Sequence, residues 1–391
     1  MGNKNIVGLV LAYKGTNYGA LLQAFATQVV VESLGVQTEI LDYKSTNRFE
    51  NFKLSYNFFV YYVNYKKQKR IEFLKSKEEQ KCKEFVDNKE ERKRISLEFR
   101  RRKLHNIRTI VGRKQLSKYV LDVCAFIVGS DQKWGPGACY GLIDSLRFVP
   151  SKVRRISYAT SLGVSTYPKY CWNESRKMWK RIDYLSVREQ QGANIIKDIC
   201  GDIDVSVVLD PTYLISKEKW LELIPFEKKC SKKYIFCYFL GNDISQKECA
   251  MKYAKMKGLH LVSLLSSESL SKIDLSFADE TVSGATPEDF INWIRGAECI
   301  FTDSFHGLAF SIINEKQLYI FYRKRGDVEQ SRNSRIDNIL ETWKIESRLI
   351  RDTNIDWSAI KEENIDYRKI QDILEEKRRF SMDFLKKALT F

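Results

Sequence analysis

Short apolar runs alternate with helical segments along most of this chain, and this alternation constrains the fold most strongly. Continuous apolar runs separated by helices are typical of parallel strands that are covered on both faces. The pattern predicts an α/β protein with parallel sheets. The strand-like runs are residues 7–12, 38–43, 125–128, 156–159, 184–187, 206–209, 234–239, 259–265, 299–302 and 318–322.

A chain of 391 residues is long for one domain, and two are expected. Charged, proline-containing sequence interrupts the alternation at residues 215–233. We therefore expect an N-terminal lobe over residues 1–215 and a C-terminal lobe over residues 216–350. Residues 351–391 are predicted to be helical, with a helix at 367–389 that packs back on the first lobe.

One strand-to-helix junction has the composition of a binding site. The apolar strand at 299–302 is followed by the turn and N-cap residue types Asp303 and Ser304 and then by an apolar helix, which places His306 in its first turn. Ligands of open α/β sheets bind at the carboxyl ends of strands, where backbone N–H groups at a helix start attract phosphate. An imidazole there could donate a proton to a phosphorylated substrate, or it could only complete the loop.

Composition argues against several classes of protein. The nine cysteines are odd in number and form no C-x-x-C pair, which argues against a disulfide framework or a zinc cage. The sequence begins without a signal-peptide pattern, and no apolar run approaches the roughly 20 residues of a membrane span. We expect a cytoplasmic protein with no metal and no cofactor.

Positive charge is concentrated in one segment. Residues 66–118 contain 20 Lys and Arg against 8 Asp and Glu, so 12 of the 16 excess positive charges lie there. The segment lacks proline, which predicts a basic helical insertion over about residues 56–118 of the first lobe, beginning with an aromatic run at 56–63. This composition suits the anionic inner face of a membrane. The alternative is a solvated insertion whose aromatic strip packs on the lobe. Nucleic acid is not expected, because no nucleic-acid-binding motif accompanies the charge.

Polar loops follow three further strands of the first lobe. They contain Ser130, Asp131 and Gln132 in one loop, Ser161 in the next and Arg188 in the third. Any one of these loops is ordinary turn chemistry. Three that open at the same edge of a sheet predict a cleft.

Seven motifs in a fixed order extend over about residues 6–350. They are Asn17-Tyr-Gly-Ala-Leu-Leu-Gln23, Gly129-Ser-Asp-Gln132 with Trp134, Ser157-Tyr-Ala-Thr-Ser-Leu-Gly163, Ser186-Val-Arg-Glu189, Val208-Leu-Asp-Pro-Thr212, Thr302-Asp-Ser-Phe-His-Gly307 and Asn333-Ser-Arg335. In content and order they resemble the polysaccharide pyruvyl transferases. The resemblance implies two Rossmann-like lobes that face each other across a cleft, similar to B-type glycosyltransferases. It also implies metal-independent transfer of a pyruvyl group from phosphoenolpyruvate to a saccharide, lipid-linked or soluble, as a cyclic ketal in cell-surface or exopolysaccharide biosynthesis.

The resemblance further implies roles for individual residues. His306 matches the proposed proton donor, and Arg188 matches the arginine thought to hold the donor substrate. Some members carry an arginine where this chain has Ser304, so another cation must replace that charge or the donor must lie differently. Arg335 and Arg323 are candidates for the missing charge from the second lobe. The other residues expected to bind substrate are Asn17, Tyr18, Ser130, Asp131, Gln132 and Ser161.

Two other functions fit the same sequence pattern. A nucleotide-sugar-dependent glycosyltransferase would share the two-lobed fold and the anion site at the helix start. A non-catalytic saccharide-binding protein would tolerate loss of His306 without losing binding. A nicotinamide dehydrogenase is disfavoured, because the loop after the first strand, Gly15-Thr-Asn-Tyr-Gly19, lacks the G-x-G-x-x-G pattern.

Overall fold

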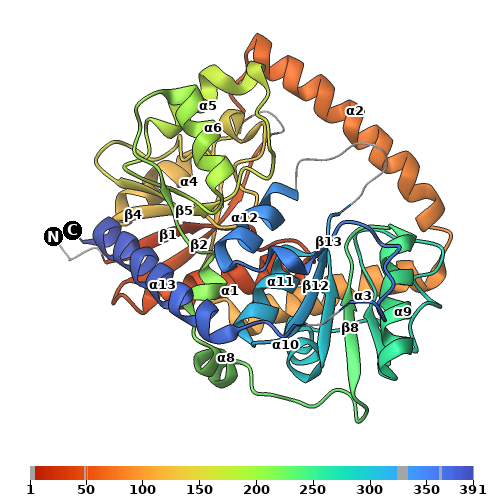
Figure 1. The fold of residues 1–391 in the computed structure, drawn as a ribbon. Helices are drawn as coiled ribbons and strands as arrows, with labels where there is room; N and C mark the ends of the chain where they lie inside the picture. Colours follow the sequence, from red (N-terminus) through yellow and green to blue (C-terminus); the bar gives the residue numbers. More distant parts are fainter. Residues whose placement is uncertain (1–4, 48–49, 51, 324–332, 361–362, 391) are drawn as a thin grey trace.

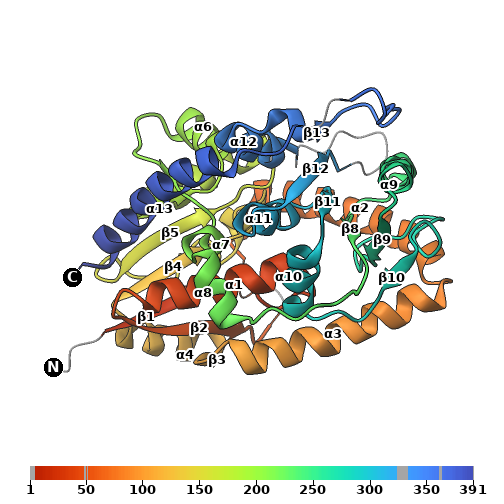
Figure 2. The same cartoon turned by 60° about the horizontal axis from the view of Figure 1, so that its bottom comes forward.

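Two parallel β-sheets, each covered by helices, form the two lobes of the protein (Figures 1 and 2). The computed structural model describes residues 5–47, 50, 52–323, 333–360 and 363–390. The sheet of the first lobe has the strand order β3-β2-β1-β4-β5-β6-β7. Its seven strands are β1 (Ile6–Val10), β2 (Gln37–Lys44), β3 (Ile107–Val111), β4 (Ala125–Gly129), β5 (Arg154–Thr160), β6 (Tyr184–Val187) and β7 (Ser206–Val207).

The sheet of the second lobe has the strand order β10-β9-β8-β11-β12-β13. Every strand pair in both sheets is parallel, which confirms the predicted fold class of two parallel-sheet α/β lobes. The two sheets lie on either side of the interrupted segment at residues 215–233. The six strands are β8 (Tyr234–Tyr238), β9 (His260–Leu264), β10 (Glu280–Val282), β11 (Cys299–Thr302), β12 (Gln317–Phe321) and β13 (Leu349–Ile350).

Helices cover both faces of each sheet, and capping residues in the sequence set the starts of several of them. Thr286 and Asp289 form a reciprocal capping box at α10, with Pro287 in the first turn. The helices are α1 (Tyr18–Glu32), α2 (Tyr56–Glu79), α3 (Lys83–Lys103), α4 (Gly112–Tyr119), α5 (Trp172–Trp179), α6 (Gln190–Cys200), α7 (Pro211–Leu214), α8 (Lys217–Leu223), α9 (Ile244–Lys257), α10 (Pro287–Gly296), α11 (Phe305–Ile313), α12 (Ser334–Trp343) and α13 (Tyr367–Leu389).

The two lobes share a hydrophobic core around α1. Most of this helix is buried, because it packs on its own sheet and also on helices of the second lobe. Leu21 and Leu22 of α1 belong to the same buried cluster as Phe290 of α10 and Phe310 of α11. Burial of a side chain of this size stabilises a fold by roughly 1.5–3 kcal/mol. The lobes are therefore joined by apolar packing beside the site.

The basic insertion differs from a run of helices, because it contains a strand. β3 pairs in parallel with β2 at the edge of the first sheet. Four of its five side chains are not buried, and Ile110 is the exception. An edge strand that is mostly exposed needs no apolar run, so no periodic pattern marks it in the sequence. The prediction of an all-helical insertion was wrong at this point.

Helix α3 of the insertion lies across both lobes (Figure 2). Arg92 donates hydrogen bonds to the carbonyl oxygens of Leu265 in the second lobe (3.2 Å) and Thr16 in the first (3.4 Å). Its guanidinium also lies 3.6 Å from the ring centre of Tyr18. Asn88 bonds two loops of the second lobe through Ser266 and Gly284. This half of the basic segment therefore holds the lobes together.

Helix α13 bridges the lobes on the other side of the molecule. It begins beside the second lobe, where Gln371 bonds Glu315 at 3.1 Å. Further along the helix, Ser381 accepts a hydrogen bond from the Leu209 N–H. Near the end of α13, the Ala388 carbonyl accepts a hydrogen bond from Arg154 of the first lobe. The C-terminal helix thus returns to the first lobe. Within the described residues, no helix combines the length and apolar character that crossing a bilayer requires.

Candidate functional site

A buried carboxylate, Asp210, connects residues from three loops at the carboxyl ends of the strands. Its Oδ2 accepts hydrogen bonds from Ser130 Oγ (2.9 Å) and Arg188 Nη1 (2.7 Å), and it lies 3.9 Å from His306 Nε2. Oδ1 accepts from the backbone N–H and the hydroxyl of Thr212. Asp210 therefore joins Ser130 and Arg188 of the first lobe to His306 of the second.

The charge of Asp210 is held by its neighbours. Burial alone would raise the pKa of this carboxyl, but attraction to Arg188 and to His306 and a hydrogen bond from Thr212 outweigh burial. The pKa of Asp210 therefore lies below its ordinary value. A carboxylate that stays charged in the interior favours a proton on a nearby imidazole.

Arg188 is almost completely buried and lies among three carboxylates. Besides Asp210, its Nε lies 3.1 Å from Glu189, and its Nη2 lies 3.9 Å from Asp131. The guanidinium also faces the ring of Phe305 at 4.1 Å. Burial would lower the pKa of Arg188, but attraction to Glu189, Asp210 and Asp131 raises it above its ordinary value. One donor group is left over, because Nη2 is buried without a hydrogen-bond partner among the described residues.

His306 is fixed by a close approach between α1 and α11. A Cβ atom on Gly19 would lie 2.1 Å from Nδ1 of the imidazole, so only glycine fits at this position of α1. The imidazole packs edge-on against Phe305, and His306 is 6% exposed. Its ring is therefore held by packing on one side while Nε2 faces Asp210.

Hydrogen bonds to the side chains just before α11 hold the start of this helix in place. Ser304 is the N-cap and accepts a hydrogen bond from the Gly307 N–H at 3.3 Å. Thr302 accepts from the Ser304 N–H. Asp303 accepts from the N–H groups of Leu240 and Gly241, both at 2.7 Å. These bonds fix the loop between β11 and α11, whose positive helix end favours an anion.

A second charged group lies beside this loop and joins the lobes. Arg323 is 3.7 Å from both Asp303 and Glu268, and Asn17 donates to the other oxygen of Glu268 at 2.8 Å. Asn17 also caps α1 by accepting from Ala20 N–H. Arg323 and Asn17 are thus brought near the start of α11, but each already has protein partners.

Most of the remaining predicted site residues make contacts within the protein itself. Tyr18 is buried between the lobes and donates to the Ala285 carbonyl at 2.6 Å. Ser161 accepts from the Gly163 N–H, and Gln132 packs where a Cβ on Gly163 would lie. Arg335 falls in α12, but its side chain lies outside the described residues. The proposed substrate contacts of these residues stay predictions.

A pocket between the lobes is bounded by the buried ion pair of Arg188 and Asp210. It has a volume of about 230 Å³ and is lined by Arg188 and Asp210 on one side. The other lining residues include Phe305 at the start of α11, Trp343 of α12 and Phe380 of α13. A substrate in this pocket would contact a fixed cation and a fixed anion beside aromatic side chains.

Two residues that organise this site were not among the predicted site residues. Asp210 could have been found, because Asp210-Pro211 follows a strand and lies in one of the seven motifs. Gly19 also lies in a motif, but its contact with His306 depends on the packing of two lobes. Nothing in the sequence spacing indicated that contact.

The fold and the site define a two-lobed α/β protein with a charged, largely buried centre between its lobes. The model of one protein family, "Polysaccharide pyruvyl transferase", matches residues 17–325. The chain therefore belongs to the polysaccharide pyruvyl transferase family. The name of this family describes transferases that act on polysaccharides. No protein of curated function matches the chain in sequence.

Solved structures of similar fold are distant in sequence. The UDP-GlcNAc 2-epimerase of Neisseria meningitidis bound to UDP-GlcNAc is 10% identical, with 98% of this chain and 93% of that chain covered and a TM-score of 0.48. The UDP-GlcNAc 2-epimerase of Methanocaldococcus jannaschii is also 10% identical, at 95% and 92% coverage and a TM-score of 0.48. Medicago truncatula UGT71G1 complexed with UDP-glucose is 10% identical, at 98% and 97% coverage and a TM-score of 0.46. These similarities concern the fold alone.

Proposed function

We propose that the protein transfers a pyruvyl group from phosphoenolpyruvate to two hydroxyl groups of a saccharide, which forms a cyclic ketal. The observation that supports this best is the placement of His306 beside Asp210, since Asp210 and the preceding residue of α11, Phe305, both line the pocket between the lobes. This arrangement offers a proton donor, a counter-charge for it and a helix end that attracts phosphate.

The proposed reaction needs one proton donor. His306 protonates the methylene carbon of phosphoenolpyruvate, which becomes a methyl group and leaves positive charge on the adjacent carbon. One saccharide hydroxyl attacks that carbon, the bond from carbon to the phosphate oxygen breaks, and the second hydroxyl closes the ring. Of the two hydroxyl protons, one restores the acid and one leaves with phosphate. Asp210 stabilises the protonated imidazole through its charge.

Donor binding requires hydrogen-bond donors that the protein itself does not already use. We propose that the Nη2 group of Arg188 supplies one contact, because this buried donor lacks a hydrogen-bond partner among the described residues. Leaving a buried donor unsatisfied costs roughly 1–3 kcal/mol, which an incoming carboxylate or phosphate would recover. Arg323 and Arg335 are the candidates for further charge in place of the arginine that some family members carry at the position of Ser304.

Incubation with phosphoenolpyruvate and a panel of saccharides tests the proposed function. We expect phosphate release that depends on the acceptor, together with an equal amount of acceptor that has gained the pyruvyl group by mass spectrometry. The panel should contain lipid-linked and soluble saccharides, because the acceptor class is part of the proposal. Nucleotide binding by calorimetry without any response to phosphoenolpyruvate would instead favour a glycosyltransferase. Saccharide binding without turnover of either donor would favour a non-catalytic protein.

We further propose that α2 places the enzyme at an anionic membrane that carries the acceptor. In Figure 1 this helix runs along the outside of the molecule. Helical spacing puts one set of exposed residues on a single outer face of α2, and the described side chains of this set are apolar or basic. Basic and apolar side chains on one face suit the interface of an anionic bilayer. The outer face of α2 consists of Tyr56, Phe59, Val63, Lys67, Arg70, Leu74 and Lys77.

Only the outer face of α2 is proposed to contact the membrane, because other parts of the basic segment pack against the protein. α3 holds the lobes together through Arg92 and Asn88, and the inner side of α2 packs through Phe58 against Tyr140. On this proposal the outer face of α2 contacts the membrane, whereas α3 and the inner side of α2 pack on the protein. All nine cysteines are free, which suits a protein of a reducing compartment and supports the inner face of the membrane as its location.

Vesicle co-sedimentation tests this location. The protein should bind vesicles with anionic lipid more strongly than neutral ones, and salt should weaken binding. Replacing Lys67, Arg70 and Lys77 by glutamine should reduce the partition coefficient by about 100-fold, because each basic residue near an anionic surface contributes about 1 kcal/mol.

The matched control makes the same charge change on the exposed side of α3. Glutamine at Lys83, Lys93 and Arg101 removes three positive charges but leaves the outer face of α2 intact. We expect a much smaller loss of binding for this control. Equal losses for the two triple variants, or equal binding to neutral and anionic vesicles, would contradict the assignment of α2.

A further inference from the structure

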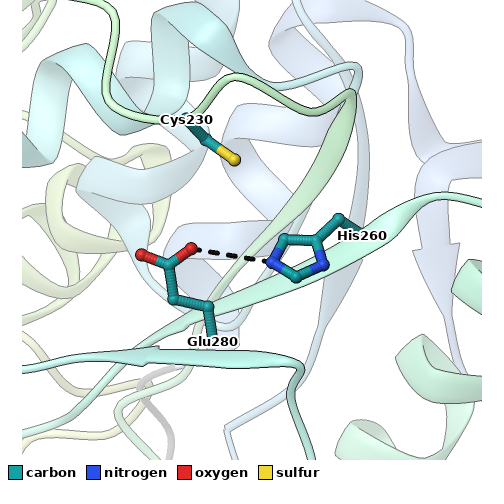
Figure 3. A group of neighbouring side chains, drawn as sticks. All are labelled: Cys230, His260 and Glu280. Carbon is teal, nitrogen blue, oxygen red and sulfur yellow. Dashed lines mark ion pairs between the residues drawn. The ribbon is translucent and has the colours of Figure 1, made fainter.

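We propose that Cys230, His260 and Glu280 form a Zn²⁺ site in the second lobe. The three side chains point toward one another (Figure 3), and their sulfur, nitrogen and oxygen ligand atoms all lie within 4.8 Å of one another. His260 Nε2 is 3.6 Å from Glu280 Oε2. Thiolate, imidazole and carboxylate are the ligands that zinc takes in proteins, and three of them leave a fourth position for water.

The site lies at the amino ends of three neighbouring strands. His260 is the first residue of β9 and Glu280 is the first residue of β10. Cys230 lies in the segment that leads into β8, and the three strands are adjacent in the order β10-β9-β8. His306, by contrast, follows the carboxyl end of β11. The proposed metal therefore takes no part in the proposed pyruvyl transfer, because it lies at the opposite edge of the sheet from the candidate active site.

Small side-chain movements would complete the coordination. Ligand atoms around a tetrahedral zinc ion with bonds of 2.0–2.3 Å lie roughly 3.3–3.8 Å apart. The contact between His260 and Glu280 already has this length. The most distant pair must approach by about 1 Å, which rotation of the side chains can supply, since the side chain of Glu280 is 43% exposed.

A neighbouring carboxylate orients the histidine. Asp279 Oδ2 lies 3.5 Å from His260 Nδ1 and accepts a hydrogen bond from the Leu261 N–H at 2.8 Å. Histidines that bind metals usually donate their second ring N–H to a carboxylate or carbonyl, which fixes the ring. With Nδ1 facing Asp279, Nε2 is the nitrogen that faces Glu280. This arrangement is independent of the three ligands and supports the same site.

Sequence spacing gave no signal for this site. The predicted absence of a metal rested on the missing C-x-x-C pair and on the metal-independent reaction that the resemblance implies. The three residues come from three separate segments of the chain. Parallel strand order brings them to one edge. A metal there would fasten the segment before β8 to the starts of β9 and β10.

Metal binding by the full-length protein tests the proposal. After chelator treatment, titration with Zn²⁺ against a competing chromophoric chelator should show one tight site per chain, and Zn²⁺ should raise the melting temperature by several degrees. Co²⁺ in the same site should show a thiolate charge-transfer band. Cys230→Ser should abolish that band and weaken Zn²⁺ binding by at least about 100-fold, whereas Asp279→Asn should keep the band and weaken binding by about 10–100-fold.

Cys82→Ser is the control, since this cysteine is also partly exposed but lies in the turn before α3. It should leave the cobalt spectrum and the Zn²⁺ affinity unchanged. Absence of a tight site or of a thiolate band in the wild-type protein would overturn the proposal, as would wild-type affinity in Cys230→Ser. Circular dichroism and acceptor-dependent phosphate release should be unchanged in the variants, so a failure here leaves the proposed function untouched.

Discussion

Replacing His306 by glutamine should lower turnover by about 100-fold or more, which is the usual scale for loss of general acid catalysis. The amide resembles imidazole in reach and polarity, so the fold and much of the affinity for phosphoenolpyruvate should persist. The rate should also lose its dependence on a protonated group, which removes one limb of the pH profile. Steady-state phosphate release across a pH series, with donor affinity by calorimetry, measures both effects.

The control for this variant is His105→Gln. His105 pairs with Glu32 at 2.8 Å on the surface of the first lobe, away from the proposed chemistry. Its replacement should leave turnover and the pH profile unchanged. Near-normal turnover in a folded His306→Gln protein would contradict the role of His306. The acid would then be sought among the carboxylates beside Arg188, Asp131 and Glu189 first.

The fold was predictable because the central strands of both sheets are buried over most of their length. Buried parallel strands are continuous apolar runs, and such runs predicted β11 with the same bounds as the structure. The helix at 367–389 was also predicted with its observed bounds. The strands that escaped prediction were short or at edges: β3, β10 and β13. Their side chains are partly exposed or too few to form a periodic pattern.

The site was predictable only in part, because strand ends indicate where residues lie but not which partners they choose. His306, Arg188 and Ser130 were expected at one sheet edge, and the structure brings them together around Asp210. The expectation that Arg188 holds the donor substrate did not anticipate its three carboxylate neighbours. Glu189 is next to Arg188 in the sequence, but the contacts with Asp131 and Asp210 join separate loops and therefore depend on tertiary structure.

Replacing Asp210 by asparagine should lower the free energy of unfolding by about 3 kcal/mol at pH 7. Removing one partner of a buried ion pair typically costs 3–5 kcal/mol, and the value should fall at the low end because Glu189 and Asp131 still face Arg188. Turnover should also fall by at least about 10-fold, because Asp210 fixes Arg188 and lies beside His306. Urea denaturation and phosphate release measure the two effects.

The surface pair of Asp183 with Arg155 provides the control for stability. Its atoms lie 3.0 Å apart, and the Asp183 side chain is 36% exposed against 11% for Arg155. Solvent weakens an ion pair that it reaches, so Asp183→Asn should cost clearly less than Asp210→Asn and leave turnover unchanged. A cost for Asp210→Asn as small as this would show that the charge of Asp210 is unimportant to the fold.

The pH dependence of the Asp210→Asn effect identifies the group responsible. The pKa of Asp210 is lowered in the folded protein, despite burial, by Arg188, His306 and Thr212. Its contribution to stability is therefore fully present above the unfolded value, near 4, and is lost as the pH falls through the lower folded value. Unfolding at pH 7, 5, 4 and 3 should show that wild type remains more stable than the variant from pH 7 to pH 5, and that this difference in unfolding free energy shrinks below about pH 4. A difference that disappears between pH 7 and pH 5 would assign the stabilisation to another titrating group.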